Sequence, residues 1–235
     1  MPDLSGHVAL VTGASRGFGF AAARAFGAAG AQVVAVARTV GGLEALDDRI
    51  KAEGGPTPVL VPLDVTDDPG VMRMGAALFE RFGRLDLWLH SAAHAGFLSR
   101  VAQITDKDLD ASLALDVRAF QRLVRAVDPL LRLAPERRGL ALIATDDRGD
   151  QPFWGLYAAA KAAQRAMTAA WALEARAEYT VAEVVPPAMP TALRGRFYPS
   201  QDPATLATID EAAAALMTAL AARPAAGARL VLETA

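Results

Sequence analysis

The stretch HVALVTGASRGFG, residues 7–19, decides the fold. Its first half is a continuous apolar run, which is typical of a strand buried on both faces of a sheet. Its second half is a glycine-rich turn, G-x-x-x-G-x-G, that opens a helix. Gly13 permits the tight turn, while Gly17 and Gly19 let backbone approach a pyrophosphate at the helix N-terminus. A plain glycine-rich turn is the alternative, but its place between the first strand and the first helix favours dinucleotide binding.

The same alternation of apolar runs and helical patterns continues to the end of the chain. It predicts an α/β fold: a doubly wound parallel sheet of about seven strands with helices on both faces, in a single domain over residues 1–235. No linker long enough to divide domains is present. The expected strands are 7–13, 32–38, 58–65, 85–92, 139–145, 180–185 and 228–233, and the expected helices are 16–29, 42–53, 67–82, 105–130, 153–177 and 210–222.

One irregular region interrupts this pattern, PPAMPTALRGRFYPSQDPATL, residues 186–206. Its prolines disfavour a continuous helix. A loop of this length in a compact domain is often a lid, so we expect a substrate lid near 186–208. The region and the segment before it carry side chains that could line an apolar pocket or pack the lid down: Phe153, Trp154, Met189, Leu193, Phe197 and Tyr198.

Composition excludes several classes of function. The 235 residues include 24 basic and 26 acidic side chains in no long run of one sign, so no nucleic-acid surface is expected. There is no cysteine, and His7, His90 and His94 are the only histidines, so no zinc–thiolate or histidine-rich metal site is expected. The start, MPDLSGHVAL, has no basic segment followed by an apolar run. We therefore expect a cytoplasmic protein without a membrane span.

Tyr157 and Lys161 form a candidate acid/base pair. They open and close the motif YAAAK on an expected helix, which places them one turn apart on the same face. A phenol has a reference pKa of about 10, and a neighbouring ammonium lowers that value by favouring the phenolate. A chance Y-x-x-x-K on an alanine-rich helix is the alternative.

Four motifs together carry a resemblance: TGASRGFG at 12–19, LDV at 63–65, LDLWLHSAA at 85–93 and YAAAK at 157–161. In this order and at these separations, the chain resembles the short-chain dehydrogenase/reductase family along nearly its whole length. The resemblance implies hydride transfer between a nicotinamide cofactor and a small-molecule carbonyl or alcohol. It gives Tyr157 the proton on the substrate oxygen and Lys161 the nicotinamide ribose. It also implies a homodimer or homotetramer built through the helices at 105–130 and 153–177.

The charge at the end of the second strand selects the cofactor. A carboxylate there would bind a ribose diol, but the sequence reads Ala37 and Arg38, and Arg16 lies in the glycine turn. Two guanidiniums suit a 2′-phosphate, so we expect NADP(H); solvated surface arginines are the alternative. In the family, Asp64 would hold the adenine amino group and Val65 would flank the ring. The expected cofactor residues are Gly13, Ser15, Arg16, Gly17, Phe18, Gly19, Arg38, Asp64, Val65, Ser91, Ala92, Tyr157, Lys161, Pro186 and Thr191.

The family's oxygen-holding serine is absent. Thr145 stands twelve residues before Tyr157 and is the expected substitute, because its hydroxyl also donates one hydrogen bond. Asp146 or Asp147 is the alternative, although a carboxylate would repel a developing oxyanion.

Three further positions depart from the family pattern. Asp116 stands where the family usually has an asparagine that anchors a water relay to the lysine. Ala93 replaces a glycine, and Pro187 replaces the glycine of a P-G pair that begins at Pro186. His90 is expected to be structural, whereas His94 lies on the surface or faces the substrate.

These residues lead to two alternative functions. The first is an active NADP-dependent oxidoreductase with Tyr157, Lys161, Thr145 and Asp116 as its catalytic group. The second is a catalytically weak or inactive NADP-binding scaffold of the same fold.

Overall fold

A computed structural model describes residues 2–146, 148 and 151–234, apart from the side chain of Arg137. Its centre is a parallel sheet of seven strands in the order β3-β2-β1-β4-β5-β6-β7. The fold predicted from the sequence is thereby confirmed. The strands are β1 Val8–Thr12, β2 Gln32–Ala37, β3 Val59–Pro62, β4 Leu87–His90, β5 Leu140–Ala144, β6 Thr180–Val185 and β7 Arg229–Val231.

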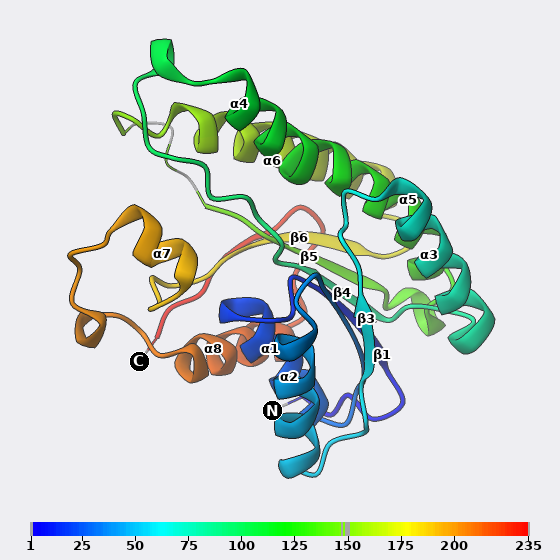
Figure 1. Cartoon of the computed structure of the whole chain (residues 1–235). Coiled ribbons are helices and arrows are strands. Elements are labelled where there is room, and N and C mark those ends of the chain that lie inside the picture. Colours follow the sequence, from blue (N-terminus) through cyan, green and yellow to red (C-terminus); the bar gives the residue numbers. More distant parts are fainter. Residues whose placement is uncertain (1, 147, 149–150, 235) are drawn as a thin grey trace.

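Helices cover both faces of the sheet (Figure 1). One face carries α1 (Gly17–Ala28), α2 (Val40–Ala52) and α8 (Ile209–Ala221). The other carries α3 (Asp68–Phe82), α5 (Phe120–Leu131) and α6 (Gly155–Ala175). Each face has its own cluster of buried apolar side chains, so the sheet separates two cores.

The long helix expected from Thr105 onward is present but irregular. Thr105 caps α4 (Asp106–Ser112) by accepting a hydrogen bond from the Asp108 amide. A π-helix, Leu113–Ala119, then leads into α5. Such wide turns are frequent at functional sites, and this one contains Asp116.

The irregular region after β6 contains one short α-helix, α7 (Ala192–Phe197), which the sequence did not predict, and a single 3₁₀ turn, Pro203–Thr205. Thr191 caps it, because its hydroxyl accepts a hydrogen bond from the Arg194 amide. In Figure 1, α7 lies apart from the other helices, beside the carboxyl ends of the strands.

Within the described residues, one stretch, Pro203–Ala221, has the length and apolar composition of a membrane-crossing helix. In the fold, the α8 part of this stretch packs its buried face against α1. The expected absence of a membrane span stays a prediction.

The chain reverses its direction of travel across the sheet between β1 and β4, which are neighbours. In such sheets, a ligand binds in the crevice outside the carboxyl ends of the strands at this switch point. Gly13 lies there with φ at +87°, and a Cβ on it would lie 2.6 Å from the Ala92 nitrogen. Only glycine allows the two strand ends to approach so closely.

Candidate active site

A cavity of about 600 Å³ opens at the carboxyl edge of the sheet. Fourteen of the fifteen expected cofactor residues line it, all except Gly19. Tyr157 and Lys161 come from α6, and the other twelve come from the turn after β1, the segments that follow β2, β3, β4 and β6, and the lid region. Thr145 lines it too, whereas Asp116 lies behind its wall and is fully buried.

The glycines of the turn have different tasks. Gly17 has φ at +58°, and a Cβ there would lie 3.1 Å from Thr191 Cγ2, so this turn approaches the lid region closely. A Cβ on Gly19 would lie 2.3 Å from the Gly13 carbonyl oxygen. Gly19 therefore allows α1 to pack on the turn, whereas the sequence analysis expected it to approach the pyrophosphate.

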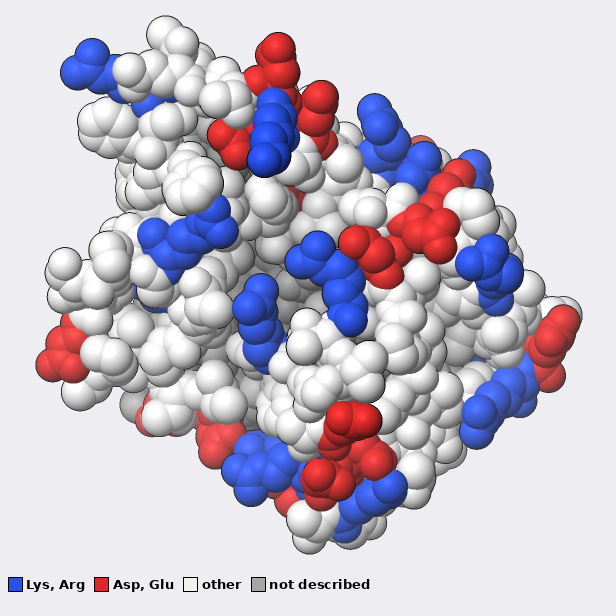
Figure 2. Space-filling view, viewed as in Figure 1, with Lys and Arg blue, Asp and Glu red and all other residues white. Residues whose placement is uncertain are grey.

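Basic side chains lie on both sides of the hollow at the centre of the face seen in Figure 2. Arg16 and Arg38 line one end of the cavity and are exposed. Arg38 forms an ion pair with Asp64 at 3.7 Å. Partial burial acts to raise the pKa of Asp64, but hydrogen bonds from Thr66 and the charge of Arg38 hold it below its ordinary value. Asp64 thus stays ionised and shares Arg38 with any anion that binds.

Tyr157 and Lys161 lie side by side in the cavity wall, on the first turns of α6. Both are almost fully buried, with 6% and 3% of their surface exposed. Burial, followed by the charges of Asp146 and Asp116, raises the pKa of Tyr157 far above its ordinary value. Burial lowers the pKa of Lys161, while Asp116 and Asp146 oppose that shift.

Thr145 follows β5 and presents a buried hydroxyl to the cavity. Its Oγ1 has no hydrogen-bond partner among the described residues. Asp146 also lines the cavity, where it forms an ion pair with Arg148 at 3.0 Å. Asp147, the other alternative for the serine position, lies outside the described residues.

Asp116 is held by the loop that follows β4. Its carboxylate accepts hydrogen bonds from the His94 amide at 3.2 and 3.3 Å. Burial raises the pKa of Asp116, and the charge of Lys161 opposes that shift. A carboxylate therefore fits at this position as an acceptor, but its charge costs free energy.

The two histidines near the site differ. His90 is buried between Trp88 and Phe120 and shares a 2.8 Å hydrogen bond with the Thr12 hydroxyl. Burial lowers its pKa to about 3, so it is neutral. This environment is that of a structural side chain. His94 lines the cavity, within reach of a substrate.

Trp154, Tyr157 and Phe197 form an aromatic cluster that lines the cavity beside α7. Ring centres of Phe197 and Tyr157 lie 5.2 Å apart, and those of Phe197 and Trp154 lie 4.6 Å apart. Leu193, Tyr198 and Met189 also line the cavity. Phe153, by contrast, is half exposed and does not line it.

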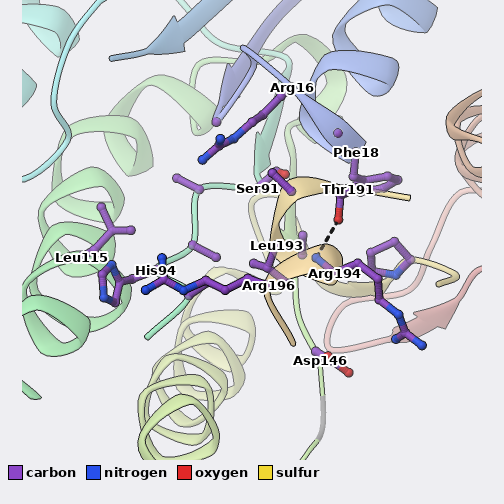
Figure 3. Close-up of a pocket in the computed structure, with 18 of the residues that line it drawn as sticks. Arg16, Phe18, Ser91, His94, Leu115, Asp146, Thr191, Leu193, Arg194 and Arg196 are labelled. Carbon is purple, nitrogen blue, oxygen red and sulfur yellow. Dashed lines mark hydrogen bonds between the residues drawn. The ribbon is translucent and has the colours of Figure 1, made fainter. Parts of the chain in front are cut away.

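Sequence analysis missed the cationic side chains of α7. Arg194 and Arg196 line the cavity, and in the described chain neither has an ion-paired carboxylate. Arg196 extends toward the loop that carries His94 (Figure 3), where its guanidinium lies 4.3 Å from the centre of the Phe97 ring. Arg194 and Arg196 are two residues apart in a segment bounded by prolines, and this pattern does not predict a helix.

Sequence analysis also missed Gln164, which is fully buried behind Lys161. Its side-chain oxygen accepts a 2.9 Å hydrogen bond from Lys161 Nζ. An amide three residues after a key lysine, on an otherwise alanine-rich helix face, is the signal that could have revealed it.

The parallel sheet, the glycine turn at its switch point and the Tyr–Lys pair define a dinucleotide-binding protein of the Rossmann class. The sequence model described as short chain dehydrogenase matches residues 7–202, most of the chain. The chain therefore belongs to the short-chain dehydrogenase/reductase family, and the resemblance noted in the sequence is confirmed.

Solved structures of similar proteins agree closely with this fold. A short-chain dehydrogenase from Shigella flexneri 2a, complexed with NADP, has a TM-score of 0.91 at 26% identity and covers 99% of each chain. One from Escherichia coli CFT073, complexed with NADPH, has a TM-score of 0.89 at 26% identity and covers 98% of each chain. The cofactors of these neighbours agree with the NADP(H) expected from Arg16 and Arg38.

Curated relatives differ in how much of their length this chain covers. The chain is 28% identical to the uncharacterized oxidoreductase YciK of Escherichia coli, over 87% of this chain and 82% of that protein. It is 34% identical to a fatty acyl-CoA reductase of Mycobacterium tuberculosis and 31% identical to a sorbitol dehydrogenase of Cereibacter sphaeroides. It spans only 43% and 63% of the length of these two proteins.

Proposed function

We propose that the protein is an NADP(H)-dependent oxidoreductase that interconverts a carbonyl and an alcohol, with Tyr157 as acid/base. The observation that carries this proposal is the shared cavity, which places the Tyr157–Lys161 pair beside the glycine turn. When bound, NADP(H) supplies or accepts the hydride. Residues 1–235 then act as one NAD(P)-binding domain, with residues 186–208 as the substrate lid.

The described residues fit a dinucleotide. Gly13 and Gly17 have positive φ values that leave the turn open for an approaching pyrophosphate at the start of α1. Arg16 and Arg38 would hold the 2′-phosphate, and Asp64 and Val65 the adenine. Ser91, Ala92, Pro186 and Thr191, on the ends of β4 and β6 and on the lid, would hold the nicotinamide half.

Proton transfer is the task of the side chains in the wall. Tyr157 Oη gives its proton to the substrate oxygen during reduction and takes it back during oxidation. The charge of Arg148 opposes the burial that raises the Tyr157 pKa, and the Lys161 ammonium, one turn away on α6, would favour the phenolate in the same way. Thr145 Oγ1 is buried without a partner among the described residues, which supports a role in donating a hydrogen bond to the same oxygen.

The aromatic cluster bounds the substrate class. Trp154, Phe197 and Leu193 offer an apolar surface next to Tyr157, so a modest hydrophobic carbonyl or alcohol fits best. The family resemblance alone supports a homodimer or homotetramer. The cytoplasmic location stays an expectation from the N-terminal sequence.

A specific observation favours a second candidate, an NADP-binding scaffold with little activity. Burial and two carboxylates act together to raise the Tyr157 pKa, which opposes formation of the phenolate.

Loss of NADPH absorbance with a panel of ketones, aldehydes and quinones separates the two candidates. We expect turnover that Tyr157→Phe lowers by about 10²–10⁴-fold, the usual contribution of a general acid or base. NADPH affinity should stay nearly unchanged in that variant, as measured by calorimetry. Tight NADPH binding without turnover on any substrate would instead establish the scaffold.

A further inference from the structure

Behind the cavity wall, buried polar side chains connect α6 to the π-helix. Lys161 Nζ donates hydrogen bonds to Gln164 Oε1 at 2.9 Å and to the Ala144 carbonyl oxygen at 3.4 Å. Gln164 Nε2 in turn donates to the carbonyl oxygen of Asp116 at 3.3 Å. Gln164 and Asp116 are both fully buried, so no solvent competes for these bonds.

The orientation of the Gln164 amide follows from its two partners. An ammonium has only donors and a backbone carbonyl only accepts, so the oxygen must face Lys161 and the nitrogen must face Asp116. Among the uncharged side chains, an amide can accept from one group and donate to the other at once. A glutamate would lose the donor, and an apolar side chain would lose both bonds.

These hydrogen bonds fix the position of the Lys161 ammonium. Of the three N–H donors of the ammonium, Gln164 and Ala144 engage two, and the third has no hydrogen-bond partner in the described part of the chain. Nζ is therefore anchored from behind, with one donor left for the cavity.

We propose that Gln164 is a positioning residue, which holds the Lys161 ammonium in place by linking it to the backbone of the π-helix at Asp116. The inference rests on the proposed function and extends it to a residue that does not touch the cavity. The π-helix supplies the acceptor, and α6 supplies both side chains, so the link also fixes the register between these two elements.

Four titratable groups surround Lys161 and bear on any pH measurement. Asp116 faces it from the π-helix, Asp146 from the segment after β5, and His90 from β4. Tyr157 lies one turn away on α6. His90 is neutral, because burial lowers its pKa to about 3. The two aspartates favour the ammonium, and burial opposes it.

The direct test is Gln164→Met, which keeps the length of the side chain and removes both hydrogen bonds. Without its acceptor, the buried ammonium should have a lower pKa in the folded protein. Burial already lowers the pKa of Lys161 in folded wild type, so the variant's folded-state pKa should be lower still. Between these two folded-state pKa values, folded wild type binds more protons than the folded variant, so the variant gains stability relative to wild type as pH rises through that window. Urea unfolding from pH 6 to pH 10 should show a stability gap, the difference in the free energy of unfolding between wild type and variant, that narrows with rising pH.

Two further variants serve as controls. Thr168 is also buried on α6, and its hydroxyl donates only to the Gln164 backbone carbonyl. Thr168→Val should therefore give a gap that does not change with pH. Gln164→Glu keeps an oxygen acceptor for Nζ, so its gap should not narrow as pH rises.

Kinetics supply a second readout. In alcohol oxidation, Gln164→Met should move the rising limb of the kcat/KM profile to higher pH by about one unit. A Lys161 side chain that loses its proton more readily offers less positive charge to the Tyr157 phenolate, so the Tyr157 pKa is lowered less. A pH-independent stability gap together with an unmoved profile would overturn the proposal. If wild type itself turns over no substrate, the proposed function fails, while the unfolding series still decides the role of Gln164.

Discussion

The hydroxyl of Thr145 is buried in the cavity without a hydrogen-bond partner among the described residues. Such a group costs free energy unless a ligand satisfies it. We expect Thr145→Val to lower turnover by roughly 10²-fold, the scale of one lost oxyanion donor. The same variant should unfold at an equal or higher urea concentration, because the unsatisfied hydroxyl is gone. Unchanged turnover would remove Thr145 from the catalytic group.

Arg38 is the residue expected to select NADPH over NADH. Wild type should bind NADPH at least about tenfold more tightly than NADH, as a charge-assisted phosphate contact requires. Arg38→Ala should remove most of that difference in calorimetry. Arg73→Ala is a matched control, because Arg73 is similarly exposed and similarly paired, at 3.6 Å from Asp67, but does not line the cavity. Equal affinities of wild type for both cofactors would contradict the assignment.

At the scale of elements, the sequence predicted those strands and turns that depend on a local pattern of residues. Most strands are apolar runs, and the glycine turn marks the switch point, so the sheet and most of the cavity could be placed from the sequence. The π-helix could not be predicted in this way. Asp116 and Gln164 are far apart in sequence, and they come into contact only when α6 packs against the π-helix. α7 was missed because the prolines on either side of it, Pro190 and Pro199, and Gly195 within it obscure a helix of six residues.

The buried carboxylate of Asp116 makes the stability of the protein depend on pH, which can be measured. Burial raises the folded-state pKa of Asp116 above its unfolded value, so the folded state binds more protons between the two values and stability falls as pH rises through that window. Asp116→Asn should therefore stabilise the protein at neutral pH and have little effect near pH 3, as followed by urea unfolding. Its amide oxygen can still accept from the His94 amide.

The same substitution should change catalysis in a defined direction. The charge of Asp116 is one of the causes that raise the Tyr157 pKa. In Asp116→Asn, the rising limb of the kcat/KM profile for alcohol oxidation should move to lower pH, and the rate at neutral pH should rise. A profile that moves to higher pH would show that the carboxylate assists the reaction through Lys161.

At the scale of the whole molecule, the expected assembly is open to a direct measurement. The two long helices carry exposed apolar side chains: Leu109, Leu113 and Leu173. We expect sedimentation to show a dimer or tetramer that Leu173→Glu weakens at low protein concentration. Phe79→Glu, on the exposed surface of α3, is the matched control and should leave the assembly intact. A wild-type monomer at every concentration would contradict the prediction.

The arrangement of the three tryptophans has an optical consequence. Trp88 and Trp171 lie in the core beneath α3, α5 and α6, with ring centres 5.9 Å apart. Trp154 alone lines the cavity, beside Tyr157 and under α7. Its fluorescence is therefore expected to respond most directly when a dihydronicotinamide enters the cavity, because Trp88 and Trp171 do not line it.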